Sequence, residues 1–472
     1  MNEATTERQA ASSLYRRVWR WHFFAGLLCL PFIFSLALTG AIYLFNKQID
    51  DIVLADLVLR PAGATSQAET APASLLLAKA AEAGGGRAQA LHWPADARHT
   101  VQVDVRGAVG ALVQVFLDPA SGDVVGSMPE TSRPMGLVKR IHSLTVAGDA
   151  GNVLIEIVAG WTIVLVISGA YLWWPRGRRQ GVVRIRPEAR GRVWWRDLHA
   201  VTGAFAAVVV LFLALTGMPW SIVWGKQVNT WLSAHGLGVP DGVWANLPRS
   251  PVPSTALGEV PWSLEPQPLP ASTVPAHAGH HGAMAPVGAG PVQADGAIGP
   301  DRAVALFADA GLTSGYRLVL PADAGGVYSA VRLRSQAASL RVLHLDQYSG
   351  KLLMDLGPAD TGAVARVTDW GVSVHQGVEY GLLNQLVMLL GCLALMLLCV
   401  SSVVMWWKRR PAGRLAAPPR KEGDRLALGV IAIAVSLGVV FPLLGASMLV
   451  AAILESGWRW WASSCIGSDK PA

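Results

Sequence analysis

Long apolar stretches separated by polar segments dominate the pattern along the chain. Five of these stretches reach the roughly 20 residues that a helix needs to cross the hydrocarbon core of a bilayer. They cover residues 23–45, 153–174, 200–224, 382–407 and 426–454. We therefore predict an α-helical membrane protein with five transmembrane helices, which has the lipid bilayer as its main partner.

The first apolar stretch follows a basic segment, so a cleaved signal peptide is the alternative to a retained helix. A signal peptide has an apolar core of about 7–15 residues and a small-residue cleavage site behind it. The stretch at 23–45 is longer and has no such site at its end. We therefore predict that these residues remain in the protein as its first helix.

Basic residues lie at one end of the apolar stretches. Residues 176–196 carry eight arginines against the single acid Glu188, and residues 408–425 add seven basic residues. Four more arginines precede the first stretch: Arg8, Arg16, Arg17 and Arg20. Because cytoplasmic loops are enriched in Lys and Arg, we place these segments and the amino terminus in the cytoplasm. After five crossings the carboxyl-terminal tail then lies on the opposite, exterior side.

Composition and charge fit this interpretation. The chain of 472 residues is 52% hydrophobic and 15% charged, a balance typical of membrane proteins. The net charge of +7 does not indicate nucleic-acid binding, because the basic residues concentrate beside the apolar stretches. Cys29, Cys392 and Cys399 lie inside apolar stretches and Cys465 stands alone, so we expect no disulfide framework.

A repeated spacing relates the first apolar stretch to the third. In each, a histidine is followed by one glycine 4 residues later and by another 18 residues later. These residues are His22, Gly26 and Gly40 in the first stretch, and His199, Gly203 and Gly217 in the third. Both stretches end in Leu-Thr-Gly.

The second and fourth stretches form another matching pair. Each has a histidine 31 and 32 residues ahead of two adjacent tryptophans, with a serine at the same offset between them. These residues are His142, Ser168, Trp173 and Trp174, and His375, Ser401, Trp406 and Trp407. Repetition at fixed distances indicates a duplicated unit.

The exterior segments between the paired stretches also repeat a short pattern. Residues 115–125 and 343–353 each predict a strand, an Asp-x-x-Ser-Gly turn and a second strand. Apolar periodicity predicts helices at 73–83 and 301–310, and alternation predicts further strands at 100–105 and 328–333. Each unit is therefore a helix, a small α+β exterior domain and a second helix.

We predict two repeats followed by an appended helix. The first repeat covers 1–180 and has its exterior domain at about 48–140. A basic loop at 181–199 leads to the second repeat, which covers 200–410 and has its exterior domain at about 226–374. Residues 411–472 then contain a cytoplasmic loop, the fifth helix and the tail. Eleven of the 29 prolines fall within 245–300. A composition of this kind buries too little surface to order itself, so we expect a flexible inserted loop there.

Four histidines carry the candidate chemistry: His22, His199, His142 and His375. Each lies at or before the start of a membrane helix, where an ionisable residue is a functional candidate. An interfacial histidine that only solvates its imidazole is the alternative, but four in register favour a function. The topology places the first two near the cytoplasmic face and the last two near the exterior face.

Two neutral imidazoles on neighbouring helices suit the axial positions of a b-type haem. Zinc normally takes four protein ligands, and no Cys, Asp or Glu accompanies either pair; no Cys-x-x-Cys-His motif for covalent haem attachment occurs. We therefore predict two b-type haems. His22 and His199 would bind the cytoplasmic-side haem iron, and His142 and His375 the periplasmic-side haem iron.

Gly26 and Gly203 lie one helical turn after their histidines. Either the missing side chain lets a flat macrocycle lie against the backbone, or the glycine only permits close helix packing. Glu156, inside the second apolar stretch, is either a proton-linked group or a buried carboxyl paired with a neighbour.

A histidine cluster in the predicted insertion is a speculative exterior metal site. It consists of His277, His280 and His281. Imidazole ligands favour copper, zinc or iron, although a loop without order would not form such a site.

The Trp-Arg-Trp-His-Phe-Phe-Ala-Gly segment, the Leu-Thr-Gly ends, the Asp-x-x-Ser-Gly turns and the His…Trp-Trp spacing resemble the PepSY-associated transmembrane proteins over about residues 14–410. That group includes siderophore-iron reductases of the bacterial inner membrane. The resemblance implies a ferric or siderophore-iron reductase that holds two b haems through the four histidines. It also implies the bacterial inner membrane as the location, which places the exterior domains and the carboxyl-terminal tail in the periplasm. The fifth stretch and the His-rich insertion depart from the simplest pattern of this family.

Two functions from different classes follow. The first is an oxidoreductase that passes electrons across the membrane to a ferric siderophore or another Fe(III) chelate in the periplasm. No Gly-x-Gly-x-x-Gly fingerprint occurs on the basic side, so its electron donor would be a cytoplasmic protein, a quinol or a diffusible reductant. The second is a non-redox module whose PepSY-like domains bind or regulate a periplasmic protein. Haem content discriminates the two.

Overall fold

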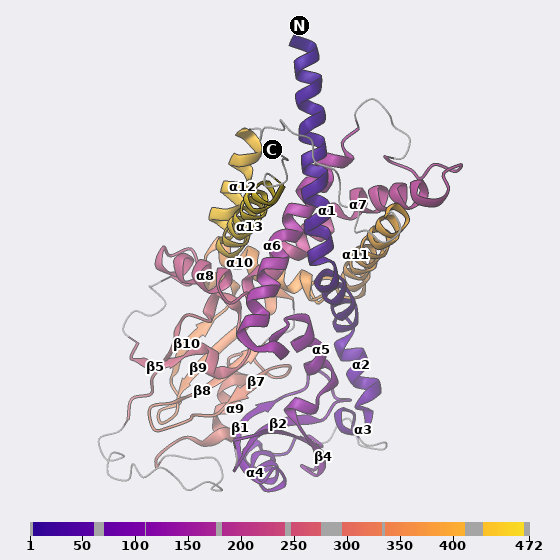
Figure 1. Ribbon diagram of the computed structural model, residues 1–472. Coiled ribbons are helices and arrows are strands. Elements are labelled where there is room, and N and C mark those ends of the chain that lie inside the picture. Colours follow the sequence, from indigo (N-terminus) through magenta and orange to yellow (C-terminus); the bar gives the residue numbers. More distant parts are fainter. Residues whose placement is uncertain are drawn as a thin grey trace. The chain divides into compact units, whose positions relative to one another are not determined.

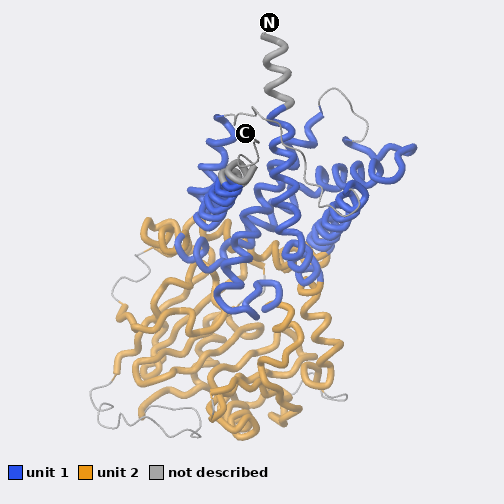
Figure 2. Tube along the Cα trace, viewed as in Figure 1, with its two compact units in different colours: residues 1–41, 140–227, 386–472 blue, residues 42–139, 228–385 orange. Residues whose placement is uncertain are grey.

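The computed structural model describes residues 3–60, 70–108, 110–175, 182–240, 247–274, 295–332, 336–410 and 428–466. These residues form two compact units, which Figure 2 shows in different colours. Unit 1 draws on residues 1–41, 140–227 and 386–472, and unit 2 on residues 42–139 and 228–385. Each unit therefore combines segments that are far apart in the sequence.

Long helices make up most of unit 1 (Figures 1 and 2). Four lie wholly or mostly within it: α1 (Glu3–Tyr43), α6 (Gly148–Trp173), α7 (Gly191–Gly217) and α11 (Gly381–Arg409). Among the described residues, these are the helices long and apolar enough to cross a membrane. They confirm four of the five predicted spans. The chain is a membrane protein, and the bilayer surrounds these helices.

Small and branched side chains hold the helices of unit 1 together. Cys29 and Ile33 of α1 pack with Val158 of α6 and Cys399 of α11. The buried cysteines in this part of the chain are free thiols, and a buried free thiol packs as a small apolar residue. The cysteines inside the apolar stretches thus contribute to helix packing.

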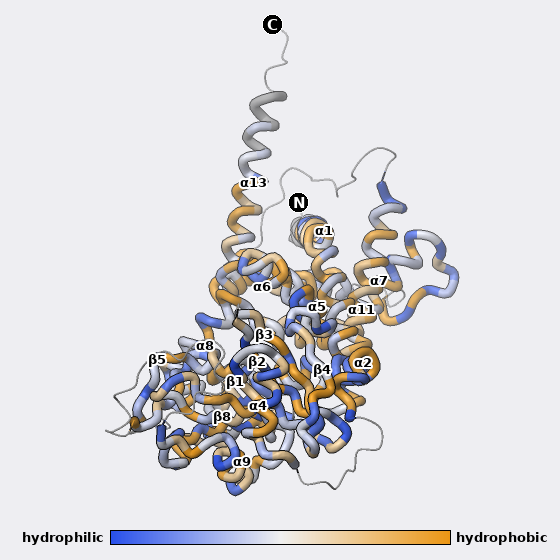
Figure 3. The backbone as a smooth tube through the Cα atoms, turned by 90° about the horizontal axis from the view of Figure 1, so that it is seen from below, coloured by the Kyte–Doolittle hydropathy of each residue, from blue (hydrophilic) through white to orange (hydrophobic). Residues whose placement is uncertain are grey.

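The fifth predicted span, 426–454, is not one continuous helix. Helix α12 (Leu428–Val440) ends before Phe441, and α13 (Pro442–Ile466) begins directly after it. Pro442 has no N–H to continue the hydrogen-bond ladder. A Cβ on Gly438 would lie 3.0 Å from the Cα of Gly445, so the chain turns sharply here. The apolar first turns of α13 are visible in Figure 3. The predicted periplasmic position of the tail required one crossing of the membrane by this segment. The structure does not support that crossing.

Unit 2 contains an antiparallel sheet of eight strands in the order β10-β9-β8-β7-β1-β2-β3-β4. The strands are β1 (Gly86–His92), β2 (Val101–Gly107), β3 (Leu112–Leu117), β4 (Val124–Pro129), β7 (Arg317–Val319), β8 (Val327–Arg332), β9 (Arg341–Asp346) and β10 (Leu352–Leu356). The two halves meet where β1 pairs with β7, with Leu91 opposite Leu318. The two predicted exterior domains therefore share one sheet.

Helices α4 (Ala73–Ala83) and α9 (Gly299–Asp309) pack on this sheet. Leu76 and Leu77 of α4 and Phe307 of α9 are fully buried in the main core of unit 2. The Ser74 N–H donates to the carboxylate of Asp301 at 3.0 Å, which joins the starts of the two helices. Both helices confirm the predictions at 73–83 and 301–310.

The two Asp-x-x-Ser-Gly turns form as predicted. The carboxylates of Asp118 and Asp346 each accept hydrogen bonds from the backbone N–H groups two and three residues later, at 2.8–3.1 Å. Gly122 and Gly350 have φ angles of +69° and +67°, a region that glycine occupies without strain. Each turn thereby joins two neighbouring strands.

Residues 247–274 have a defined fold where a loop was expected. They include the paired strands β5 (Arg249–Pro253) and β6 (Pro268–Pro270). Leu257 and Leu264 of this segment pack in a core with Val331 and Val342 of the sheet. Apolar residues between the prolines supply the buried surface that the composition did not suggest. Residues 275–294 lie outside the described residues.

Shorter helices complete the described chain. They are α2 (Asn46–Val53), α3 (Ala55–Val58), α5 (Pro134–His142), α8 (Trp224–Ala234) and α10 (Ala363–His375). His142 is the last residue of α5 and His375 the last residue of α10. These two predicted ligands therefore hold the same place ahead of α6 and α11.

Candidate functional site

His22 of α1 and His199 of α7 lie close together in unit 1, as the repeat predicts. Their ring centroids are 6.5 Å apart and their planes are nearly perpendicular, at 87°. Two imidazoles on opposite sides of one metal, each bonded at about 2 Å, have centroids roughly 6 Å apart. Edge-to-face ring contact, at about 4.5–7 Å, is the alternative explanation. The spacing fits one metal between the two rings.

Each of these histidines uses its Nδ1 in a hydrogen bond to a serine hydroxyl. His22 Nδ1 lies 2.8 Å from Oγ of Ser168 on α6, and His199 Nδ1 lies 3.0 Å from Oγ of Ser401 on α11. The other ring nitrogen, Nε2, is then the atom left for a metal. Metal-binding histidines commonly use their second nitrogen in this way.

The glycines one turn later have room for a side chain. A Cβ built on Gly26 would have Leu165 as its nearest neighbour at 3.8 Å, and one built on Gly203 would have Leu398 at 3.6 Å. Both are ordinary van der Waals distances, so the protein atoms leave room for a methyl group. The neighbouring helices therefore do not require a glycine at either position, and space for a flat ligand stays a prediction.

His142 is held in unit 1 by the Leu-Thr-Gly end of the first span. Its Nδ1 lies 3.0 Å from Oγ1 of Thr39. A Cβ on Gly40 would lie 3.3 Å from its ring, so this glycine makes room for the imidazole. Burial lowers the pKa of His142, which keeps it neutral, as a metal ligand must be. His375 belongs to unit 2, and its predicted pairing with His142 stays a prediction.

Few protein ligands surround these histidines. In the part of the chain that the structure describes, no group of three or more His, Cys, Asp or Glu side chains is arranged so that it could hold a metal ion. Zinc would normally require more protein ligands than two. A haem needs only two axial ligands, because its macrocycle supplies the rest. The donor set therefore fits a haem.

A family description, the PepSY-associated TM region, matches residues 19–409. The chain belongs to this family. The match includes the four repeated histidines and ends with α11, so α12 and α13 of this PepSY-associated protein lie beyond it. No curated protein matches the chain.

Glu156 of this PepSY-associated chain binds backbone rather than a ligand. Its carboxylate, which is 3% exposed, accepts hydrogen bonds from the N–H groups of Val223 at 2.9 Å and Trp224 at 3.1 Å. Asn152, one turn earlier on α6, accepts from the Ile222 N–H at 3.0 Å. A carboxylate at a helix start compensates unpaired N–H groups. Of the two explanations, the paired buried carboxyl is favoured.

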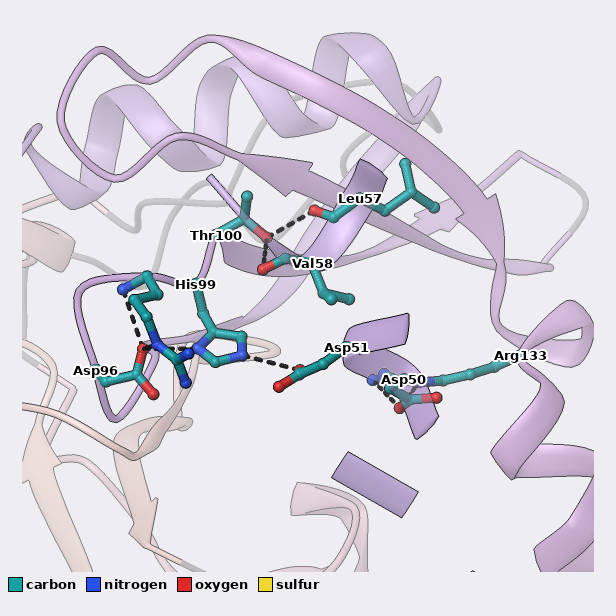
Figure 4. A network of polar contacts seen from close by, with 9 residues as sticks. Asp50, Asp51, Leu57, Val58, Asp96, His99, Thr100 and Arg133 are labelled. Carbon is teal, nitrogen blue, oxygen red and sulfur yellow. Dashed lines mark hydrogen bonds and ion pairs between the residues drawn. The ribbon is translucent and has the colours of Figure 1, made fainter. Parts of the chain in front are cut away.

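A charged network in unit 2 fastens the segment after α1 to the sheet (Figure 4). His99 lies between two carboxylates, with Nδ1 2.7 Å from Asp96 and Nε2 3.0 Å from Asp51. Burial would lower the pKa of His99, but hydrogen bonds to both acids outweigh it and raise the pKa. The neighbouring Asp50 accepts from Arg133 at 2.9 Å. We assign this network to holding α2 in place.

A second charged cluster lies where the two halves of the sheet join. The Asp104 carboxylate, 4% exposed, lies 2.8 Å from Nε2 of His92 and 3.0 Å from the Arg317 guanidinium. Burial favours the neutral acid, but the contacts with His92 and Arg317 outweigh it and hold the pKa of Asp104 at about 2. The carboxylate thus ties β2 to β1 and β7.

A pair of acids connects the inserted segment to α10. The Ser263 hydroxyl donates to Asp369 of α10 at 3.3 Å. Burial raises the pKa of Asp369 to about 7, and burial together with the charge of Asp369 raises the pKa of Glu265 to about 7. Both acids therefore keep their protons to a higher pH than exposed carboxyl groups do.

The sequence identified the histidines but not the groups that hold them. Ser168 and Ser401 recur at equivalent offsets, and Thr39 belongs to the repeated Leu-Thr-Gly. That recurrence was the signal for their contacts, although the pattern gives no direction for a hydroxyl. The speculative metal site of His277, His280 and His281 lies outside the described residues.

Proposed function

We propose that this protein is a membrane oxidoreductase with two b-type haems that reduces ferric iron, most simply a ferric siderophore, on the periplasmic side. The meeting of His22 and His199 at a ring separation of 6.5 Å carries the proposal. Two half-sites from different helices converge, and the described residues contain no group of three or more side chains that could hold a metal ion by themselves. That arrangement is useful to a haem and has no evident use in a module that only binds proteins.

In this proposal the chain supplies axial ligands and the space around them. His22 and His199 hold one haem through Nε2, and Gly26 and Gly203 leave space beside it. His142 and His375 hold the second. Each bound haem supplies a one-electron carrier. The apolar side chains of α1, α6 and α11 exclude water from the helix interior.

The direction of transfer follows from the predicted orientation. The basic segments favour the cytoplasm for the amino terminus, which puts the unit 2 sheet in the periplasm. One electron from a cytoplasmic redox protein, a quinol or a diffusible reductant would convert one Fe(III) to Fe(II). Ferrous iron binds hard oxygen ligands more weakly than ferric iron does, so reduction would release iron from its chelate for uptake.

We further propose that the two halves arose by duplication. The spacing from histidine to glycine in α1 recurs in α7, and the spacing from histidine to tryptophan in α6 recurs in α11. The sheet of unit 2 runs through four strands of one half and four of the other. A duplicated unit explains why the ligands come as pairs from equivalent positions.

The test is the haem content and redox behaviour of the purified protein. A reduced-minus-oxidised spectrum from haem-sufficient cells should show the α band of a low-spin b haem. Mixing the reduced protein with a ferric siderophore should reoxidise it and produce Fe(II), detected by a ferrous-specific chelator. A preparation without haem would exclude the reductase and favour the non-redox PepSY module. If a ferric chelate does not reoxidise the reduced haem, the proposed substrate is wrong.

A further inference from the structure

Hydroxyl groups contact three of the four histidines, and each hydroxyl also contacts a backbone carbonyl. Ser168 Oγ lies 2.7 Å from the Val164 carbonyl, one turn earlier on α6. Thr39 Oγ1 lies 2.6 Å from the Ser35 carbonyl on α1. Ser401 Oγ lies 3.0 Å from a carbonyl of its own helix, α11.

The single proton of each hydroxyl decides the direction of the histidine contact. A carbonyl oxygen only accepts hydrogen bonds, so the short contact to it takes the hydroxyl proton. The hydroxyl oxygen can then only accept from the imidazole, which must carry its proton on Nδ1.

We propose that Ser168, Ser401 and Thr39 are positioning residues that fix His22, His199 and His142 as Nδ1–H tautomers and so direct the Nε2 lone pair to haem iron. This inference rests on the proposed function. A serine in a membrane helix often bonds its own backbone carbonyl, and that alone would explain one hydroxyl. It does not explain three hydroxyls that each lie within 3.0 Å of a histidine Nδ1.

The two cytoplasmic-side histidines differ in one respect. Next to Ser401, Ser402 also lies near His199 Nδ1, at 3.4 Å, while its hydroxyl donates to the Leu398 carbonyl at 2.7 Å. Next to Ser168 stands Gly169, where a Cβ would lie 3.3 Å from the His22 ring. His199 therefore has a second acceptor, and His22 has one. The same substitution should affect the two sites unequally.

The consequence for the haem follows from the donor strength of the ligand. A hydrogen bond from Nδ1–H makes the imidazole more basic, and a more basic axial ligand favours oxidised iron. Loss of the acceptor should raise the fraction of reduced haem at a fixed ambient potential. It should also weaken haem retention by about 10–100-fold, as is usual for outer-shell partners of metal ligands.

The experiment compares Ser168→Ala, Ser401→Ala and the Ser401→Ala/Ser402→Ala double variant in the full-length protein. Ser447→Ala is the matched control, because Ser447 donates to a carbonyl of its own helix at 2.7 Å but accepts from Trp161 instead of a histidine. Haem per protein and the reduced fraction across a potential titration are measured. Ser168→Thr keeps the hydroxyl and should restore wild-type values.

We expect Ser168→Ala to raise the reduced fraction clearly, Ser401→Ala less, and the double variant as much as Ser168→Ala. Wild-type haem content and titration in Ser168→Ala would overturn the positioning role while leaving the proposed function intact. The same change in Ser447→Ala would show a general effect of lost hydroxyls and would also overturn it. A wild-type protein without haem would instead sink the proposed function and this inference together.

Discussion

The two halves of the chain keep the same chemistry around their histidines but differ on the sheet of unit 2. His22 with Ser168 and His199 with Ser401 have nearly the same contact, at 2.8 and 3.0 Å. On the sheet, Asp104 faces Gln114 across β2 and β3. At the corresponding place of the second half, two valines face each other across β8 and β9.

This comparison distinguishes the histidine contacts, which both halves share, from the side-chain pairs on the sheet, which they do not share. The polar pair of the first half is satisfied by side chains such as Arg317, which donates to Asp104. In the second half Val331 and Val342 belong to the apolar core that the inserted segment completes. The histidine contacts are thus common to both halves, whereas the buried pairs on the sheet differ.

Placing the acid of the first half in the valine pair of the second half should cause the largest loss of stability. Val342→Asp would bury a carboxylate in an apolar core, with Val331 and Leu356 opposite it on the two neighbouring strands. An unpaired buried charge of this kind costs about 4 kcal/mol or more. The apparent Tm of the full-length protein should fall far more than in the Val342→Ala control. Equal losses in both variants would show that the charge is solvated and that the two halves are less different than described.

The reverse exchange, Asp104→Val, should be nearly as damaging. It leaves Arg317 and His92 at the β1–β7 junction without their shared carboxylate, and breaking a buried pair costs about 3 kcal/mol. Thermal unfolding and limited proteolysis between the two halves of the sheet measure the loss. Asp104→Asn keeps the shape and a hydrogen-bond acceptor, and should lose less. A stable Asp104→Val protein would mean that the cluster does not join the halves.

The acid pair of the second half predicts that stability falls as the pH rises through neutrality. The folded pKa values of Asp369 and Glu265, about 7, lie above their ordinary values of 3.8 and 4.5. The folded state therefore holds protons that the unfolded state releases. The stabilisation is fully present below about pH 4 and is lost as the pH rises through 7. Tm should fall between pH 5 and pH 8, and Asp369→Asn with Glu265→Gln should flatten that slope.

The smallest effect on stability is expected at the glycines that both halves share. Gly26→Ala adds a methyl group where the nearest side-chain atom is 3.8 Å away, and alanine favours a helix by about 1 kcal/mol over glycine. The apoprotein should be as stable as the wild type or slightly more so, while haem content falls because the methyl group occupies ligand space. Gly457→Ala on α13, where a Cβ meets nothing within 4 Å, is the control. Unchanged haem in Gly26→Ala would mean that no ligand lies against this glycine.

Local patterns in the sequence were enough for much of the fold. Apolar length gave four membrane helices, and periodicity gave α4 and α9 almost to the residue. The break between α12 and α13 at Pro442 was not predicted, because the residues around it are as apolar as those of a spanning helix. The sequence also did not predict that the strands of both halves form one sheet, since the β1–β7 pairing joins residues more than two hundred positions apart. Long-range pairing of this kind leaves no local signal.

The sequence predicted only part of the candidate site. Equal spacings identified His22 and His199 as partners, since a repeat places equivalent residues at one depth. The hydroxyls of Ser168, Ser401 and Thr39 recurred as well, but their use depends on how α6 and α11 pack on neighbouring helices, which spacing does not encode. The order of residues 247–274 also depended on tertiary burial, which overrides a proline-rich composition.

The most direct measurement of the central claim is haem per protein in His22→Ala, His199→Ala and the double variant. If the two histidines share one iron, each single change should remove the same haem, and the double variant should retain as much haem as either single variant. His142→Ala should then remove the other haem. Additive losses in the His22→Ala/His199→Ala protein, or full haem content in either single variant, would contradict the shared site.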